Sequence, residues 1–351
     1  MAIVAASLKY VGGQSVQADL LIRNWRGDSR VEAFLVPIDP DPPGWFAWSY
    51  QIPGLRTLVR QPLYLWELWK GLGRADIAHI FSASYWAFDM AVVPAWLVAR
   101  MRGKKTLVHY HSGEAKDHLQ RFRTAKPVLQ KQDALVVPSG FLVDVFREFD
   151  LKAVAIPNIV DLSQFRFRER KPLRPHLVCT RGFHSYYCVD VVVRAFAEVV
   201  KQYPDARLDL VGKGPLEGEV RQLVADLKLT GVNFTGVASR GEIGRYYEQA
   251  DIFINASRLD NMPVSILEAY AAGTPVVTTA PDGMRYVVED GRTGLLSPVG
   301  DYVALAGNVL RLLREPEMAA QMAHDAVQQS KRYEWNVVRQ EWLDVYEGLA
   351  K

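Results

Sequence analysis

Residues 257–277 read SRLDNMPVSILEAYAAGTPVV, a polar loop followed by two apolar segments. A polar loop at 257–261 leads through Met262 and Pro263 into an apolar-periodic segment that stops at Gly273, and a short apolar run follows. Pro263 suits the first helical turn, where its missing N–H would have no partner, and Gly273 suits the left-handed position that ends a helix. The stretch therefore predicts a loop, a helix and a strand in that order.

The start of this helix is predicted to bind a phosphate. Backbone amides around Met262, Val264 and Ser265 are expected to give the helix a positive end. Asp260 lies just before the helix, and Glu268 follows eight residues later, about a turn and a half along it. A ligand held at the amides can then meet one carboxylate on either side, a sugar at one and a ribose at the other. The alternative is that Asp260 is a loop or capping residue and Glu268 belongs to a solvated helix face.

The composition indicates a soluble globular protein with enough chain for two domains. The chain has 351 residues, of which 49% are hydrophobic and 23% charged. A net charge of +3 does not indicate a nucleic-acid partner, although it permits local basic patches. Cys179 and Cys188 lack metal-ligand spacing and predict reduced thiols in a cytosolic protein. No signal peptide or apolar run of about 18 residues occurs, so we expect neither secretion nor a membrane span.

Strand and helix patterns alternate along the chain and predict an α/β fold with mostly parallel sheets. Predicted strands lie at 2–8, 31–38, 75–81, 106–109, 134–138, 176–180, 206–211 and 251–255. The charged, proline-bearing segment 166–175 predicts an exposed linker between two domains. We therefore expect an N-terminal domain at 1–165, a second domain at 166–333 and a final helix at 334–351. Trp335, Val338, Trp342 and Tyr346 give that helix an apolar stripe.

Several candidate ligand residues follow predicted strands, where ligands bind in open α/β sheets. Gly12 and Gly13 follow the first strand and either let the backbone approach a ligand or form an ordinary tight turn. His111, or its neighbour His109, can hydrogen-bond a sugar hydroxyl without carrying charge, or can cap a local turn. Arg181 follows the strand at 176–180 and offers a diphosphate bidentate geometry.

Two further motifs have alternative interpretations. Asp39-Pro-Asp41 has the form of an acidic metal site, but the interleaved prolines favour a stiff loop, and we expect no metal. The glycines of 212–218 have nearly the spacing of a dinucleotide fingerprint. About twenty residues further on, however, the segment 232–236 (VNFTG) lacks the acid that would bind a ribose, which disfavours a nicotinamide cofactor.

Residues 44–72 are unusually rich in aromatic side chains, with basic residues among them. The aromatics are Trp45, Phe46, Trp48, Tyr50, Tyr64, Trp66 and Trp69, and the basic residues are Arg56, Arg60 and Lys70. This combination suits contact with an anionic membrane, through residues 45–70, or with an apolar acceptor. Alternatively, about half of these aromatics belong to the core.

Asp260, Glu268 and the sequence AGTPVV at 272–277 resemble the acidic pair and following strand of the retaining family-4 glycosyltransferases, the glycosyl transferases group 1. That family has the GT-B fold and usually has glutamate where this chain has Asp260. The segments 155–165 (AIPNIVDLSQF) and 281–297 also resemble the family. Most members carry Lys-Gly shortly after the arginine equivalent to Arg181, which this chain lacks. Lys213, Arg258 and Arg285 are candidate substitutes.

The resemblance implies two Rossmann-like domains facing across a cleft, with the last helix crossing back to the first domain. It implies metal-independent transfer of a sugar from a nucleotide-diphosphate-sugar, UDP- or GDP-linked, to a hydroxyl acceptor with retention of configuration. The acceptor is a glycan, a lipid-linked molecule or a small molecule. We expect a cytoplasmic protein, at the membrane face if the acceptor is a lipid. Alternatives are a nucleotide-sugar epimerase or phosphorylase of this fold, or a non-catalytic homologue.

The resemblance also implies a role for each candidate residue. Glu268 binds the ribose, Asp260 binds hydroxyls of the transferred sugar, and Arg181 with the helix start neutralises the diphosphate. His111 and the Gly12-Gly13 loop complete the pocket. The backbone at Val237 holds the base. The remaining donor-binding residues are expected to be Asn261, Met262, Pro263, Val264, Ser265 and Lys213.

Overall fold

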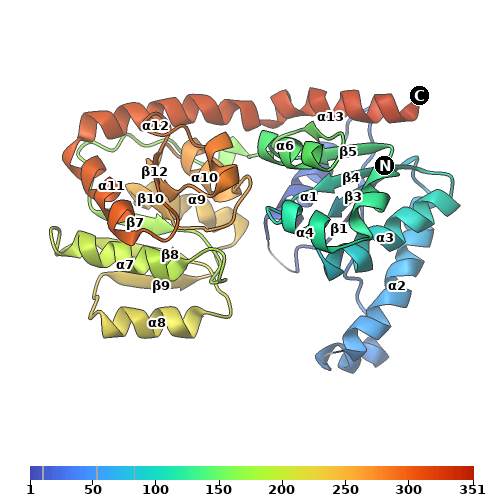
Figure 1. Ribbon diagram of the computed structural model, residues 1–351, viewed down its shortest axis with the longest axis horizontal. Helices are drawn as coiled ribbons and strands as arrows, with labels where there is room; N and C mark the ends of the chain where they lie inside the picture. Colours follow the sequence, from blue (N-terminus) through green and yellow to red (C-terminus); the bar gives the residue numbers. More distant parts are fainter. Residues whose placement is uncertain (10–11, 53, 83) are drawn as a thin grey trace. The chain divides into compact units, whose positions relative to one another are not determined.

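The computed structural model describes residues 1–351 except 10–11, 53 and 83 (Figure 1). The chain divides into two compact units, Met1–Ile159 with Val338–Lys351, and Val160–Val337. Each unit contains a six-stranded sheet in which neighbouring strands run parallel. The predicted α/β fold with two Rossmann-like sheets is confirmed. The limits of the units lie a few residues from those predicted for the domains.

The first unit has the strand order β2-β1-β3-β4-β5-β6. Its strands are β1 Ala2–Ala5, β2 Phe34–Pro37, β3 Ile77–Ser82, β4 Lys105–Tyr110, β5 Ala134–Val137 and β6 Val154–Ala155. Its helices are α1 Gly13–Asn24, η1 Gly44–Gln51, α2 Leu55–Leu72, α3 Trp86–Met101, α4 Ala115–Arg121, α5 Ala125–Gln130 and α6 Gly140–Glu148, together with most of α13 Trp335–Ala350.

Alternation along the strands gives this sheet two buried faces. Val4, Ile80 and Val108 pack with apolar side chains of α2 and α3 in one core. On the other face, Trp342 of α13 lies against His79 and His109. The apolar stripe predicted for the last helix is present, since Val338, Trp342 and Tyr346 are buried.

The second unit has the strand order β12-β11-β10-β7-β8-β9. Its strands are β7 His176–Cys179, β8 Arg207–Val211, β9 Val232–Gly236, β10 Ile252–Asn255, β11 Val276–Thr279 and β12 Leu295–Ser297. Its helices are η2 Leu162–Gln164, α7 Val189–Val200, α8 Glu217–Asp226, α9 Arg240–Gln249, α10 Val264–Ala271, η3 Asp282–Tyr286, α11 Tyr302–Arg314, α12 Pro316–Ser330 and η4 Lys331–Tyr333. The direction of strand addition reverses between β7 and β10, and such a switch point is where doubly wound sheets bind ligands.

Helices cover both faces of the second sheet (Figure 1). Residues of α7 and α11 form one core with one face, and residues of α9, α10 and α12 form the other. Local signals in the sequence place two of these helices. Ser239 and Glu242 form the predicted capping box of α9. Helix α10 begins at Val264, one residue after Pro263, and the left-handed Gly273 (φ 63°) follows its end.

The segment 166–175, predicted to be an exposed linker between domains, has six exposed residues but lies within the second unit. Arg170 is buried, and its guanidinium donates hydrogen bonds to the carbonyl oxygens of Tyr247, Ala272 and Gly273. These carbonyls lie at or near the ends of α9 and α10, where carbonyls lack intrahelical partners. A charged side chain of this segment thus caps the ends of α9 and α10. The sequence prediction took its charge as a sign of a solvated linker.

The aromatic segment is far more exposed than its composition suggested. Of its seven aromatic side chains, Tyr64 is buried, whereas Trp45 is 78% and Trp66 60% exposed. The expectation that about half belong to the core is therefore wrong. Among the helices within the described ranges, none has both the length and the apolar character needed to span a bilayer.

Candidate functional site

Arg181 and Asp260 meet at the switch point of the second sheet. Arg181 follows β7, Asp260 follows β10, and their side chains form a buried ion pair. The guanidinium also donates to the Ser265 hydroxyl, at 3.1 Å, and lies over the Tyr187 ring, 3.7 Å from its centroid. The structure thus places the predicted arginine, the first acid and the start of α10 in one cluster.

Three close contacts between glycines and neighbouring backbone hold this cluster together. A Cβ on Gly283 would lie 2.5 Å from the carbonyl oxygen of Asp260, so only glycine lets this loop lie against the acid's backbone. A Cβ on Gly212 would lie 2.5 Å from the carbonyl oxygen of Arg181, and one on Gly214 would lie equally close to that of Phe183. The glycines at 212–218 that resemble a dinucleotide fingerprint therefore allow the β8 loop to pack against the arginine loop.

The first amides of α10 lack an acceptor within the helix. Its N-cap residue, Pro263, provides no side-chain hydrogen bond to the first turn. The amides of Val264 and Ser265 occupy the first two helical positions and therefore lack an intrahelical acceptor. Asn261 and Met262 are buried beside them. The positive end of the helix dipole and the Arg181 guanidinium thus lie within one short stretch of structure.

Glu268 lies on α10 beyond these amides. The Tyr247 hydroxyl donates a 2.8 Å hydrogen bond to its Oε2. Burial raises the pKa of Glu268 to about 7, although the bond from Tyr247 and the charge of Arg181 oppose the shift. Burial also raises the pKa of Asp260, again against the effect of Arg181. Both carboxyls are costly to ionise, and a ligand that donates hydroxyl hydrogens to them would offset that cost.

Lys213 and Arg258 both border the Arg181 loop. The Lys213 carbonyl accepts a 3.1 Å hydrogen bond from the Phe183 amide, and the Lys213 Cε lies 3.4 Å from the position of a Cβ on Gly236. The Arg258 amide donates to the Tyr186 carbonyl at 3.0 Å. Both side chains are exposed. Val237, the predicted contact for the base, is also exposed and follows the end of β9.

The remaining predicted residues belong to the first unit. Gly12 is extended (φ −155°), caps α1 by hydrogen bonds with the Ser15 hydroxyl, and is followed by Gly13 at the helix start. A Cβ added to either glycine would meet no described atom within 4 Å beyond the adjoining chain, so the loop surface is open. His111 follows β4, and burial lowers its pKa to about 3, which keeps the imidazole neutral.

The acids of 39–41 have other partners. Asp39 accepts hydrogen bonds from the Ser7 amide (2.8 Å) and hydroxyl (2.6 Å), and Asp41 pairs with Lys9. They therefore tie a loop to the segment after β1, as the prediction of a stiff loop suggested. Across the part of the chain that the structure describes, no three or more metal-ligating side chains converge.

Tyr247 and Tyr187 are functional candidates that the sequence did not reveal. Tyr247 bonds both Glu268 and the Thr180 hydroxyl, at 2.8 and 2.7 Å, so it connects the second acid to the end of β7. Tyr187 stacks on Arg181. Helical periodicity could have placed Tyr247 on the buried face of α9, but nothing in the local sequence identifies its partners.

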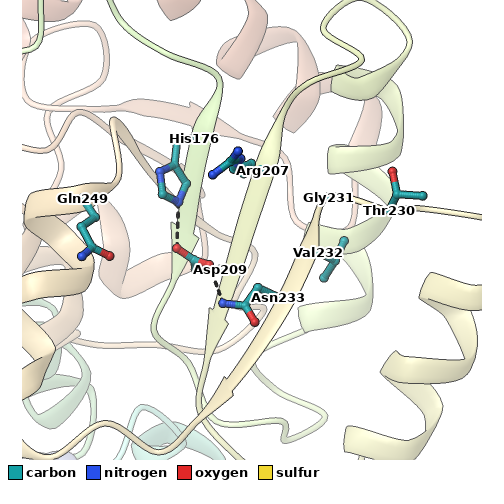
Figure 2. A pocket seen from close by; sticks show the side chains of 8 residues that line it. All are labelled: His176, Arg207, Asp209, Thr230, Gly231, Val232, Asn233 and Gln249. Carbon is teal, nitrogen blue, oxygen red and sulfur yellow. Dashed lines mark hydrogen bonds and ion pairs between the residues drawn. The ribbon is translucent and has the colours of Figure 1, made fainter.

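A concavity of about 360 Å³ lies at the opposite edge of this sheet (Figure 2). Three of its lining residues, His176, Arg207 and Val232, are the first residues of β7, β8 and β9. The His176 Nε2 lies 2.7 Å from Asp209, which also accepts from Asn233 at 3.1 Å. Because doubly wound sheets bind their ligands at the carboxyl ends of strands, we do not assign this concavity to the donor.

Comparisons with known proteins agree with this architecture. Residues 9–164 match the family described as Glycosyltransferase Family 4, and residues 174–315 match Glycosyl transferases group 1. A phosphatidyl-myo-inositol mannosyltransferase of Mycobacterium leprae is 30% identical over 315 residues, 85% of this chain and 78% of that protein. A D-inositol 3-phosphate glycosyltransferase of Nocardioides sp. is 25% identical over 333 residues, 84% of this chain and 72% of that protein.

Two solved structures share the fold over nearly the whole chain. The Anabaena protein HepE in complex with UDP has a TM-score of 0.75 at 16% identity, and the match covers 99% of both chains. Sucrose-phosphate synthase from Thermosynechococcus elongatus has a TM-score of 0.80 at 21% identity, again over 99% of both chains. The paired parallel sheets and these matches define a GT-B glycosyltransferase fold.

The chain belongs to the family-4 glycosyltransferases, the glycosyl transferases group 1. The predicted enzyme class, a glycosyltransferase that uses a nucleotide sugar, is confirmed at the level of this family. None of these matches favours an epimerase, a phosphorylase or a non-catalytic homologue.

Proposed function

We propose that the cluster at the β7/β10 switch point binds a UDP- or GDP-sugar and transfers its sugar with retention of configuration. The observation that carries this proposal is the position of Arg181, which lies beside the uncapped start of α10 with Asp260 on one side and Glu268 further along the helix. In this proposal the diphosphate oxygens accept hydrogen bonds from the amides of Val264 and Ser265, and the ribose hydroxyls donate to Glu268. Asp260 then faces hydroxyls of the transferred sugar.

Charge on the leaving diphosphate determines the chemistry. The bond between the anomeric carbon and the β-phosphate oxygen breaks, which leaves an oxocarbenium-like sugar and a more negative diphosphate. The acceptor oxygen attacks the same face, and its proton passes to the departing phosphate oxygen. Fixed donors directed at that developing charge lower the barrier, and Arg181 and the α10 amides are such donors. His111 and the Gly12-Gly13 loop of the first unit are proposed to contact the sugar.

Lys213 is the best substitute for the missing family lysine. Its position beside the Arg181 loop supports this role, and its exposed ammonium has no acidic partner among the residues described here. In a thermal-shift titration, we expect UDP or GDP at about 100 times its Kd to add about 2.7 kcal/mol to the free energy of unfolding. Lys213→Ala should need more nucleotide for the same shift, whereas Lys228→Ala, an exposed lysine after α8, should not. If no nucleoside diphosphate raises the melting temperature, the donor site is wrong.

We also propose that the acceptor is held at an anionic membrane. Leu58, Leu65, Trp66 and Trp69 lie at helical spacing on one exposed face of α2, and Trp45 of η1 is exposed nearby in sequence. Such a face, with cations beside it, suits insertion into a lipid interface. The relative from Mycobacterium leprae is named for transfer to a phosphatidylinositol, which supports a lipid acceptor here.

Vesicle flotation tests the membrane surface. The protein should float with vesicles that contain phosphatidylglycerol, and Trp45→Ser with Trp66→Ser should reduce the bound fraction about tenfold, because each indole contributes an apolar insertion of roughly a kcal/mol. Tyr302→Ser removes an exposed aromatic of α11 and should leave flotation unchanged. Equal flotation of both variants, or none by the native protein, would exclude this surface.

A further inference from the structure

Three histidines lie along one face of the first sheet. His79 belongs to β3, His109 belongs to β4, and His111 follows β4. Because side chains alternate along a strand, all three point to the face opposite Ile80 and Val108, which pack in the core with α2 and α3. The rings of His109 and His111 are 4.0 Å apart, and His111 also stacks on Phe81 at 5.1 Å.

Helix α13 closes over two of these rings and bonds one of them. The Tyr346 hydroxyl lies 2.9 Å from His79 Nδ1, and His79 Nε2 lies 3.3 Å from His109 Nδ1. The Trp342 ring covers both histidines, with centroids 4.9 and 5.0 Å away. A continuous series of buried polar groups therefore runs from the C-terminal helix to the ring that packs against His111.

The direction of these hydrogen bonds follows from the group at the far end. The Tyr346 hydroxyl has one hydrogen, and His79 Nδ1 is an acceptor within hydrogen-bond distance of it. A buried hydroxyl whose hydrogen lacks an acceptor is costly, so Tyr346 donates to His79 Nδ1. Burial lowers the pKa of His79 to about 3 and that of His109 well below its usual value, so both rings are neutral and carry one proton each. His79 therefore donates from Nε2 to His109 Nδ1, and His109 holds its own proton on Nε2.

The last two nitrogens of this series are buried without a protein partner. His109 Nε2 and His111 Nε2 are both enclosed, and neither has a hydrogen-bond partner among the residues that the structure describes. An isolated polar group of this kind costs about 1–3 kcal/mol. Enclosed nitrogens of this kind also occur elsewhere in the described chain, at Trp342 and His118, but the two imidazole nitrogens belong to adjacent rings, and a polar ligand there would satisfy them.

We propose that Tyr346 is a positioning residue for His111, acting through His79 and His109, so that the C-terminal helix fixes the orientation of the histidine at the sugar site. This inference rests on the proposed role of His111. Tyr346 bonds His79, His79 bonds His109, and the oriented His109 ring confines His111 against Phe81. Without the tyrosine hydroxyl, His79 and His109 can exchange tautomers and His111 loses its fixed neighbour.

Nitrogen NMR of the full chain labelled with 15N-histidine tests the series directly, because the 15N shifts distinguish the two neutral tautomers. In the native protein, His79 and His109 should both carry the proton on Nε2. In Tyr346→Phe, the His109 signal should move toward a mixture of tautomers, and kcat should fall about tenfold, as expected for loss of one buried hydrogen bond. The KM for the donor should change little. Tyr64→Phe, which removes another buried hydroxyl of this unit, should alter neither property.

The outcomes separate this inference from the proposed site. Near-normal activity of His111→Ala would overturn the role of His111, and the inference with it. If His111→Ala is inactive but Tyr346→Phe keeps native tautomers and kcat, the site stands and the positioning role is wrong. A proton on Nδ1 of His109 in the native protein would also overturn it, even if Tyr346→Phe fails to fold.

Discussion

Replacing Arg181 with alanine should lower kcat by about a thousandfold. Removal of a preorganised donor to a developing negative charge typically costs about 10²–10³ in rate, and Arg181 contributes a full charge as well. The substitution also leaves Asp260 buried without its cation, which costs about 3–5 kcal/mol of stability. Activity must therefore be measured together with a melting curve.

A double variant separates the two effects. Arg181→Met with Asp260→Asn removes both charges and leaves a buried neutral pair, so stability should return to within about 1–2 kcal/mol of the native value. Activity should not return, because the donor to the diphosphate is still missing. Arg181→Lys should recover only part of the rate, since an ammonium cannot match the planar fork that bonds Asp260 and Ser265 together. A fully active double variant would exclude Arg181 from the chemistry.

Glutamine in place of Glu268 should lower kcat/KM about 100-fold while stabilising the folded protein at pH 8. A hydrogen bond to a charged acceptor contributes about 1.5–3 kcal/mol, and the neutral amide loses most of it. Alanine removes the acceptor altogether and should abolish transfer. Near-normal activity of the alanine variant, with intact fold, would contradict the assignment of Glu268 to the ribose.

The gain in stability follows from the raised pKa of Glu268. The pKa of Glu268 is about 7 in the folded protein, whereas the ordinary pKa of a glutamate is 4.5. Between these values the folded state holds more protons than the unfolded state, so stability falls as pH rises through the window from about 4.5 to 7. Well above pH 7 the loss is about 3–4 kcal/mol. Glutamine cannot ionise, so urea melts should show the variant more stable at pH 8 and similar to the native protein at pH 4.5. Equal stability at both pH values would show that the carboxyl is not buried as described.

Short-range signals explain how much of the structure could be predicted. The loop, helix and strand at 257–277 are set by Pro263, Gly273 and apolar spacing, and the α9 cap is set by Ser239 and Glu242. The two parallel sheets follow from the alternation of strands and helices. Each of these features depends on residues a few positions apart, where the sequence directly constrains the backbone.

The features that escaped prediction depend on contacts between distant residues. The acceptors for the Arg170 guanidinium lie in the segment from Tyr247 to Thr274. No sequence pattern within 166–175 predicts these distant partners. Tyr247 reaches Glu268 and Thr180 from a third element. The exposure of Trp66 beside the buried Tyr64 on the same helix depends on which side of α2 meets the sheet. Composition is the same in either arrangement, so only the tertiary structure distinguishes them.

A crystal structure with the nucleoside diphosphate that gives the largest thermal shift will show whether the donor binds at the start of α10. The diphosphate oxygens should lie within about 3.2 Å of the Val264 and Ser265 amides and of the Arg181 guanidinium, with a ribose hydroxyl on Glu268. A nucleotide bound at the amino ends of the strands, against His176 and Asp209, would contradict binding at that site.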